Sequence, residues 1–350
     1  MSAATEDALA EKRPQMPEKY TWLRQATSLY DSCCVSLCVP TSDIDDARSS
    51  LAKGVPEDSV IDALPRRVVA VKIPGEGSTQ PTMHSELRIL QEIHRQSYSR
   101  SGGEHCIEVV DHYDMEAMAQ GEPGWLVMAS SPVSSDLEGF FVFDTRDKLP
   151  KCLLWLIITQ LYETIYFLHR ECKPTITHGS VLAEDILISF PNEEKKNGEV
   201  TIAKRPKISL VGFAKSCIHD PTNSPDGLER KARAEEEDVE SLAQLIRKLI
   251  YRCYEHEDVY DGKPGGKMTR LVRKYLKDDA PEEVRKFMQR DARDLEGVWA
   301  AIGVFAKEEL GKVRNEEWEE VRDSVDEVAE GKVKLSDIVK DVLKGQPANN

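Results

Sequence analysis

The chain has 350 residues, which is enough for a large core and allows a domain of two lobes. Apolar residues make up 40% and charged residues 31%, a balance typical of a soluble globular protein. The net charge of −15 disfavours a nucleic acid or an anionic membrane as the main partner, because both would repel an acidic surface.

The cysteines and the apolar stretches place the protein inside the cell. Eight cysteines occur without a C-x-x-C pair or two clusters at zinc-ligand spacing, so we expect reduced, mostly buried thiols and no metal site. The polar N-terminus is not a secretory signal. The most apolar stretch, residues 152–168, contains polar residues and predicts a buried helix instead of a membrane span. We therefore expect an intracellular protein, cytoplasmic or nuclear.

The first half of the chain is dominated by strand patterns. Residues 1–18 are charged with few large apolar groups, so we expect a disordered tail. Two short strands are predicted within 20–39, an acidic inserted loop over 41–66, and a strand over 66–73. Leu87, Leu90 and Ile93 recur at helical spacing within 83–96. Two more strands are predicted over 107–114 and 124–130.

The second half is dominated by helix patterns. A long buried helix is predicted over 153–169, and a strand pair over 185–190 and 207–213, joined by a charged inserted loop at 191–206. Residues 235–254 open with acidic residues and then become apolar, as in a helix with a favourable N-terminus. Residues 255–345 alternate charged and apolar residues at helical period, and the chain contains no internal repeat.

Six segments in this order resemble the eukaryotic protein kinase superfamily. VVAVKI resembles the strand that carries the nucleotide-contacting lysine, here Lys72, and SELRILQEI places Glu86 as its helix partner. HGSVLAEDILI aligns with the catalytic loop H-R-D-L-x-x-x-N, and KISLVGFAK aligns with the segment that contains D-F-G. SPD at 224–226 lies where A-P-E is expected, and DVESLA at 238–243 resembles the start of the central helix of the large lobe.

The resemblance implies an α+β bilobal fold with a small antiparallel β-rich N-lobe carrying one helix and a larger, mostly helical C-lobe. We expect the N-lobe over residues 19–131, with the insertion 41–66. The C-lobe is then expected over 132–345, with the insertion 191–206 and a divergent helical end at 255–345.

The glycine loop of the family is missing. The best match to G-x-G-x-x-G-x-V places Ala26, Ser28 and Asp31 at the three glycine positions, and no glycine occurs in residues 1–53. Side chains there would block the close approach of backbone amides to phosphate, and the carboxylate of Asp31 would repel it.

The catalytic positions of the family are degenerate as well. Ser180 replaces the catalytic aspartate, and a serine hydroxyl is no base at neutral pH without an activating partner. Leu182 replaces a lysine, so a positive charge is lost. Asp185 stands at the metal-binding asparagine, where it is a weak metal candidate, and Leu210 replaces the D-F-G aspartate and offers no oxygen. We therefore expect no catalytic residue and no metal site.

The positions that the family uses for architecture are retained. Lys72 and Glu86 would either contact a residual nucleotide or form a structural ion pair, and we favour the ion pair because the glycines and the D-F-G aspartate are absent. The remaining expectations concern the adenine pocket and the packing around the catalytic loop. They assign Ala70 and Leu187 to the adenine pocket, Leu90 to a contact with Val211, His178 to the loop, and Asp238 to tying the loop backbone to the central helix.

These losses predict a pseudokinase that acts as a protein-interaction, scaffolding or regulatory module. We expect no cofactor, ATP being the open alternative, and a protein partner, such as an active kinase or a complex subunit. Segments 41–66, 191–206 and 316–343 are candidate contact elements, the last being alternatively an ordinary packed helix. The competing hypotheses are an atypical serine/threonine protein kinase or other transferase with weak nucleotide binding through Lys72 and Asp185, and, ranked third, a small-molecule phosphotransferase.

Overall fold

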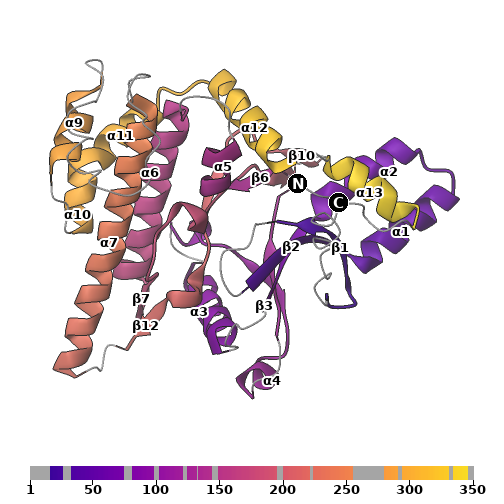
Figure 1. The fold of residues 1–350 in the computed structure, drawn as a ribbon, viewed down its shortest axis with the longest axis horizontal. Helices are drawn as coiled ribbons and strands as arrows, with labels where there is room; N and C mark the ends of the chain where they lie inside the picture. Colours follow the sequence, from indigo (N-terminus) through magenta and orange to yellow (C-terminus); the bar gives the residue numbers. More distant parts are fainter. Residues whose placement is uncertain are drawn as a thin grey trace, which may run out of the picture. The chain divides into compact units, whose positions relative to one another are not determined.

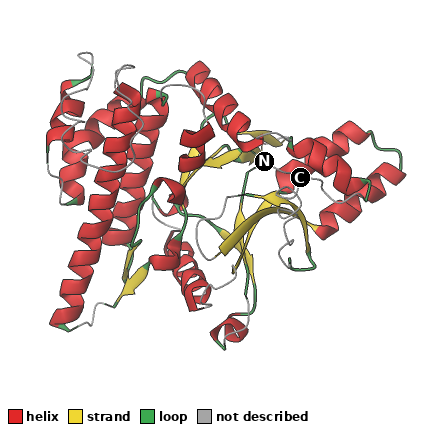
Figure 2. Cartoon of the chain, in the orientation of Figure 1, coloured by secondary structure: helices red, strands yellow, loops and turns green. Residues whose placement is uncertain are grey.

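The structure is a computed structural model, and it describes most of the chain. The described residues are 16–26, 33–74, 81–97, 102–120, 124–131, 133–143, 149–194, 200–220, 224–254, 280–290, 294–330 and 334–345. The fold is α+β, with an antiparallel sheet in the N-terminal region and helices in most of the C-terminal part (Figure 2).

The chain divides into two compact units. The first contains residues 1–87, 109–132 and 332–350, and the second contains residues 88–108 and 133–331. The expected parts were a tail over 1–18, an N-lobe over 19–131 and a C-lobe over 132–345. In the structure, residues 88–108 group with the helical unit and the C-terminal segment groups with the sheet.

The first unit is built on a five-stranded antiparallel sheet. Its strand order is β1-β2-β3-β5-β4, so β1 and β4 are the edges. The strands are β1 (Tyr20–Gln25), β2 (Cys33–Pro40), β3 (Val69–Pro74), β4 (Val109–His112) and β5 (Leu126–Ala129). All five predicted strands are confirmed. Apolar residues at every second position, such as Val69 and Val71, favour a strand because they place one face of the sheet in the core.

A helix covers one face of this sheet. Helix α3 (Pro81–Ser97) is the predicted helix, and the short α4 (Met115–Ala119) lies between β4 and β5. Met83 and Leu87 of α3 pack with Met118 and with Leu126 of β5 in one apolar cluster. The apolar residues at helical spacing therefore carry α3 onto the sheet and place Glu86 beside β3.

The inserted loop predicted over 41–66 is wrong, because this segment is helical. It forms α1 (Thr41–Ala52), α2 (Glu57–Ala63) and a short 3₁₀ helix (Leu64–Arg67). Ile44 and Ala47 of α1 enter a core with Val60 of α2 and with the sheet residues Leu23 and Leu37. The acidic composition hid two apolar residues at helical spacing, and these are enough to bury one face.

The C-terminal helix α13 (Leu335–Leu343) completes the same core. Its residues Leu335, Ile338, Val339 and Val342 are buried with α1 and α2, beside which α13 lies in Figure 1. Arg48 of α1 donates to the carbonyl oxygen of Val342 at 2.8 Å and so caps the helix end. This part of the segment 316–343 therefore packs one apolar face in the core, and the role of the segment as a contact element stays a prediction.

The described residues of the second unit form three small antiparallel sheets. One has the order β11-β8-β6, and the others pair β7 with β12 and β9 with β10. The strands are β6 (Ser134–Asp136), β7 (Thr175–Thr177), β8 (Ile186–Ser189), β9 (Asn192–Glu194), β10 (Val200–Ile202), β11 (Lys207–Leu210) and β12 (Cys217–His219). The predicted pair β8–β11 is confirmed, whereas the loop predicted at 191–206 contains the hairpin strands β9 and β10.

Most of the other described residues of the second unit are helical. They are α5 (Leu137–Phe143), α6 (Lys151–Tyr166), α7 (Pro225–Tyr254), α9 (Glu282–Gln289), α10 (Leu295–Val298), α11 (Val304–Leu310) and α12 (Asn315–Glu330). Helix α6 continues as a π-helix over Phe167–Glu171. Within the described residues, 151–171 is the single helix long and apolar enough to cross a membrane, but 78% of its apolar window is buried in the protein, as in the core helix of a soluble protein.

Candidate functional site

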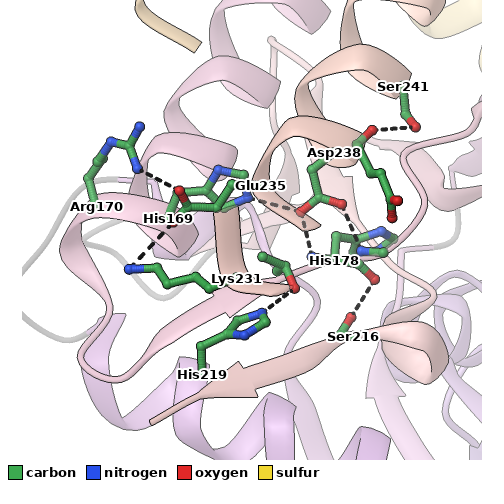
Figure 3. Close-up of polar contacts among 12 residues, drawn as sticks. His169, Arg170, His178, Ser216, His219, Lys231, Glu235, Asp238 and Ser241 are labelled. Atoms are coloured by element: carbon green, nitrogen blue, oxygen red, sulfur yellow. Dashed lines mark hydrogen bonds and ion pairs between the residues drawn. The ribbon is translucent and has the colours of Figure 1, made fainter. Parts of the chain in front are cut away.

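A buried aspartate organises the loop that follows β7. Asp238 of α7 is completely buried, and its Oδ2 accepts a hydrogen bond from the backbone N–H of His178 at 2.7 Å (Figure 3). Its Oδ1 accepts one from the backbone N–H of Gly179, also at 2.7 Å. The contact expected of Asp238 is therefore present, and α7 holds the loop backbone through one carboxylate.

His169 is a member of this cluster that the sequence analysis missed. It is buried at the end of the helix that starts as α6, and its Nε2 donates to Oδ2 of Asp238 at 2.9 Å. The available signal for this contact was a histidine at the end of the predicted apolar helix 153–169, a few residues before the loop that starts at His178. Because Asp238 receives three hydrogen bonds, its charge is compensated although it is fully buried.

The side chain of His178 fixes the loop from its other side. Its Nε2 donates to the carbonyl oxygen of Val211 at 2.8 Å, and its ring meets Phe213 edge-on at 4.8 Å. The hydroxyl of Ser216 donates to the carbonyl oxygen of His178 at 2.9 Å. Gly179 has φ +86°, and a Cβ there would lie 2.6 Å from the carbonyl oxygen of Lys215, so a glycine is required. The loop is thus locked between α7 and residues 211–216.

The degenerate positions lie on and beside this locked loop. Ser180 is half-buried, and Leu182 is 40% exposed. Leu210 is completely buried on β11, and its carbonyl oxygen accepts from the N–H of Ile107. Its side chain is therefore part of the core and provides no oxygen for a metal.

Asp185 is the carboxylate that stands at the expected metal-binding asparagine position. It is half-buried, and its Oδ2 accepts from the N–H of Leu182 at 3.3 Å. The backbone of Gly212, at φ +81°, leaves no room for a Cβ beside Oδ1 of Asp185. In the part of the chain that the structure describes, no group of three or more His, Cys, Asp or Glu side chains gathers as metal ligands.

Lys72 and Glu86 meet in the first unit. The ammonium of Lys72 on β3 lies 2.9 and 2.7 Å from the two carboxylate oxygens of Glu86 on α3. Lys72 is 8% exposed and Glu86 is 2% exposed, so the pair is shielded from water. The structure thus brings together two residues that the sequence separates by 14 positions, and the ion pair fastens α3 to the sheet.

The other predicted residues are placed but not all are tested. Ala70 on β3 and Leu187 on β8 are both half-buried and belong to different units. Leu90 is buried, and its predicted contact with Val211 stays a prediction. Of the glycine-loop positions, Ala26 is described and exposed, whereas Ser28 and Asp31 lie outside the described residues.

The segment after Val211 is short and closes into a strand pair. β12 pairs with β7, and His219 Nε2 lies 2.9 Å from the hydroxyl of Thr177. Burial, and then the charge of Lys231, lower the pKa of His219. Pro225 already opens α7, so the SPD tripeptide lies at the start of the helix that carries Asp238.

Comparison with known proteins adds no identification. No model of a protein family matches the chain, and no curated protein matches it.

Proposed function

We propose that the chain is a protein-kinase-like domain without phosphoryl-transfer activity that acts as a protein-interaction module. The observation that carries the proposal is the contrast around Asp238. The carboxylate of Asp238, which would hold a catalytic loop in place, accepts hydrogen bonds from the backbone N–H groups of His178 and Gly179. The next loop residue, Ser180, stands at the expected catalytic position, and the buried Leu210 stands at the expected metal-binding position. The groups that stabilise the loop are thus present, whereas the groups that phosphoryl transfer needs are replaced.

Phosphoryl transfer depends on charge neutralisation and positioning. A kinase supplies a base and carboxylate or amide oxygens that hold magnesium on the phosphates. Ser180 offers a hydroxyl in place of a carboxylate base, and Leu210, which is buried, has no ligand atom. Each lost group corresponds to roughly 2–4 kcal/mol of transition-state stabilisation, by analogy with an oxyanion-hole donor, so two or more losses leave little catalysis.

The partner is proposed to be a protein with a basic or mixed-charge surface. The net charge of −15 would steer such a partner and repel polyanions. α13 and the apolar face of α1 are less available for contact than the sequence suggested, because they are buried in the core of the first unit. The hairpin of β9 and β10, with Ile202 37% exposed, remains a candidate contact element.

The second candidate is an atypical kinase or other transferase that retains weak nucleotide binding. The intact pair of Lys72 and Glu86 favours it, because the same lysine could contact phosphate oxygens. Asp185 would then be the residual metal ligand, with one carboxylate where magnesium sites use one or two.

A thermal-shift titration separates the two candidates. The full chain is melted with ATP alone, with ATP and Mg²⁺, and with ATP and Mn²⁺, beside the Lys72→Ala variant. Lys53→Ala serves as a control, since Lys53 is exposed in the same unit. Each variant is compared with its own nucleotide-free melting temperature, because Lys72→Ala also lowers stability.

The proposal expects no metal-dependent shift and no transfer of radiolabelled phosphate to protein or small-molecule acceptors. A shift of several degrees that requires the metal and disappears in Lys72→Ala but not in Lys53→Ala would favour the second candidate. Turnover that a substitution of Asp185 abolishes would overturn the proposal. A partner protein that co-purifies with the chain in a stoichiometric complex from the native cell would support the proposal directly, provided that the complex forms again from the two purified proteins.

A further inference from the structure

A cation lies against aromatic rings on the sheet of the first unit, apart from every residue used above. The ammonium of Lys19 is 4.5 Å from the ring centroid of Trp125 and 5.8 Å from that of Tyr20. Both distances are within the range of about 6 Å in which a ring face attracts a cation. The same ammonium is 2.6 Å from Oδ2 of Asp111.

The aromatic walls of this site are held in place by their neighbours. Tyr20 and Trp125 meet edge-to-face, with centroids 6.1 Å apart and planes at 72°. Tyr113 meets Trp125 in a similar way, at 6.2 Å and 64°. Tyr20 and Trp125 also pack on a buried cluster that includes Cys38 and Val127. The rings therefore form a fixed surface instead of loose side chains.

The carboxylate is fixed as well. The hydroxyl of Tyr20 donates to Oδ2 of Asp111 at 2.6 Å, and the N–H of His112 donates to Oδ1 at 2.9 Å. Burial opposes ionisation of Asp111, but the hydrogen bonds from Lys19 and Tyr20 outweigh it and lower its pKa. Asp111 thus presents an ionised, oriented acceptor to any cation that enters.

The position in the sheet shows how the site is assembled. Tyr20 begins β1 and Asp111 lies on β4, which are the two edge strands of the sheet. The Tyr20–Asp111 hydrogen bond requires the sheet to curve until its edges approach. The carbonyl oxygen of Lys19 accepts from the N–H of Thr41 at 2.9 Å, so the backbone of Lys19 is anchored.

The ammonium of Lys19 is nevertheless able to leave the aromatic rings and Asp111. The side chain of Lys19 is 54% exposed and that of Asp111 is 30% exposed, so solvent and solutes reach the cation. Release needs only a change of the Lys19 rotamer, because the backbone can stay where it is.

We propose that Tyr20, Trp125 and Asp111 form a binding site for the alkylammonium group of a peptide lysine, unmodified or N-methylated, and that Lys19 occupies it as a built-in competitor. The ring faces favour alkylated, weakly hydrated cations, as in aromatic cages that recognise methyl-lysine. The carboxylate requires an N–H donor at close range. The site therefore prefers a lysine with up to two methyl groups over trimethyllysine, which has no N–H.

This inference is independent of the proposed function, because the site shares no residue with Lys72, Glu86 or the loop at Asp238. An intramolecular competitor reduces the apparent affinity by the fraction of molecules in which the site is open. If Lys19 is released in about one molecule in ten, its removal strengthens binding about tenfold.

The test measures binding of the acetylated amide of N,N-dimethyllysine to the full chain by calorimetry and by NMR of the indole N–H groups. Wild type, Lys19→Ala and the control Lys53→Ala are compared. We expect Lys19→Ala to bind about tenfold more tightly than wild type and than Lys53→Ala, with the trimethyllysine analogue weaker than the dimethyl one.

Two further variants locate the binding. Adding Trp125→Leu to Lys19→Ala should abolish the affinity. If the Trp125→Leu protein does not fold, Asp111→Asn, which keeps the shape of the site, is added to Lys19→Ala instead. This variant should lose the preference for dimethyllysine over trimethyllysine. Equal affinity of wild type and Lys19→Ala, binding that survives Trp125→Leu, or no saturable binding in Lys19→Ala would each overturn the inference.

Discussion

The buried ion pair of Lys72 and Glu86 makes a quantitative prediction about stability. At a separation of 2.7 Å and an effective dielectric constant of about 20, the two charges attract each other by about 6 kcal/mol. The cost of removing both charges from water offsets most of this attraction. The net contribution of the pair is therefore small, but the penalty for breaking it is large.

Lys72→Met tests the penalty. It leaves the carboxylate of Glu86, which is 2% exposed, in the core without its ammonium, so we expect a loss of about 3–5 kcal/mol in the free energy of unfolding. The double variant Lys72→Met/Glu86→Leu removes both charges and should recover most of that loss, to within about 1–2 kcal/mol of wild type. Urea unfolding followed by circular dichroism measures all three proteins.

An exposed pair of the same type is the matched control. Lys286 and Glu282 lie 2.7 Å apart on α9 and are more than half exposed. Lys286→Met should leave the unfolding curve unchanged within error, because water screens the charges. A double variant as unstable as Lys72→Met, or a Lys72→Met protein as stable as wild type, would refute the reasoning about the buried pair.

Three further predictions test the loop and the thiols. Asp238→Ala removes the acceptor of three hydrogen bonds, from the backbone N–H groups of His178 and Gly179 and from His169, and should cost about 3–6 kcal/mol, measured by urea unfolding. Gly212→Ala should cost more than Gly54→Ala, which we expect to cost about 1–2 kcal/mol. Both residues have a left-handed φ, but only at Gly212 does the new Cβ meet Asp185. At pH 8 a thiol reagent should label Cys217, which is exposed, well before Cys38, whose pKa burial raises to about 12.

Each of these predictions has a control and a contrary outcome. Asp226→Asn, at the exposed start of α7, should leave the free energy of unfolding unchanged. An Asp238→Ala protein as stable as wild type would mean that Asp238 does not anchor the loop. Equal costs for the two glycine variants would mean that Asp185 yields to the added methyl group. Labelling of Cys38 as fast as Cys217, located by mass spectrometry of the labelled peptides, would mean that burial does not protect this thiol.

The sequence alone determined the order and type of most elements. Periodicity predicts strands β1 to β5, helix α3, the pair of β8 and β11, and helix α7. Apolar residues that recur every two or every 3.6 residues lie on one face of a strand or helix, and that face is the one that is buried. The expected contact of Asp238 and the pairing of Lys72 with Glu86 came from the resemblance to the protein kinase superfamily, because neither follows from periodicity.

The tertiary structure decided what local pattern could not. The segment 41–66 carries Ile44, Ala47 and Leu51 at helical spacing among many charged and turn-forming residues. The core that these side chains enter is completed by α13, about 290 residues later. Likewise, His169 and the site around Lys19 depend on contacts between distant segments, such as that of Tyr20 with Asp111. Side chains that meet only through the curvature of a sheet or the return of a distant helix leave no periodic signal in the sequence.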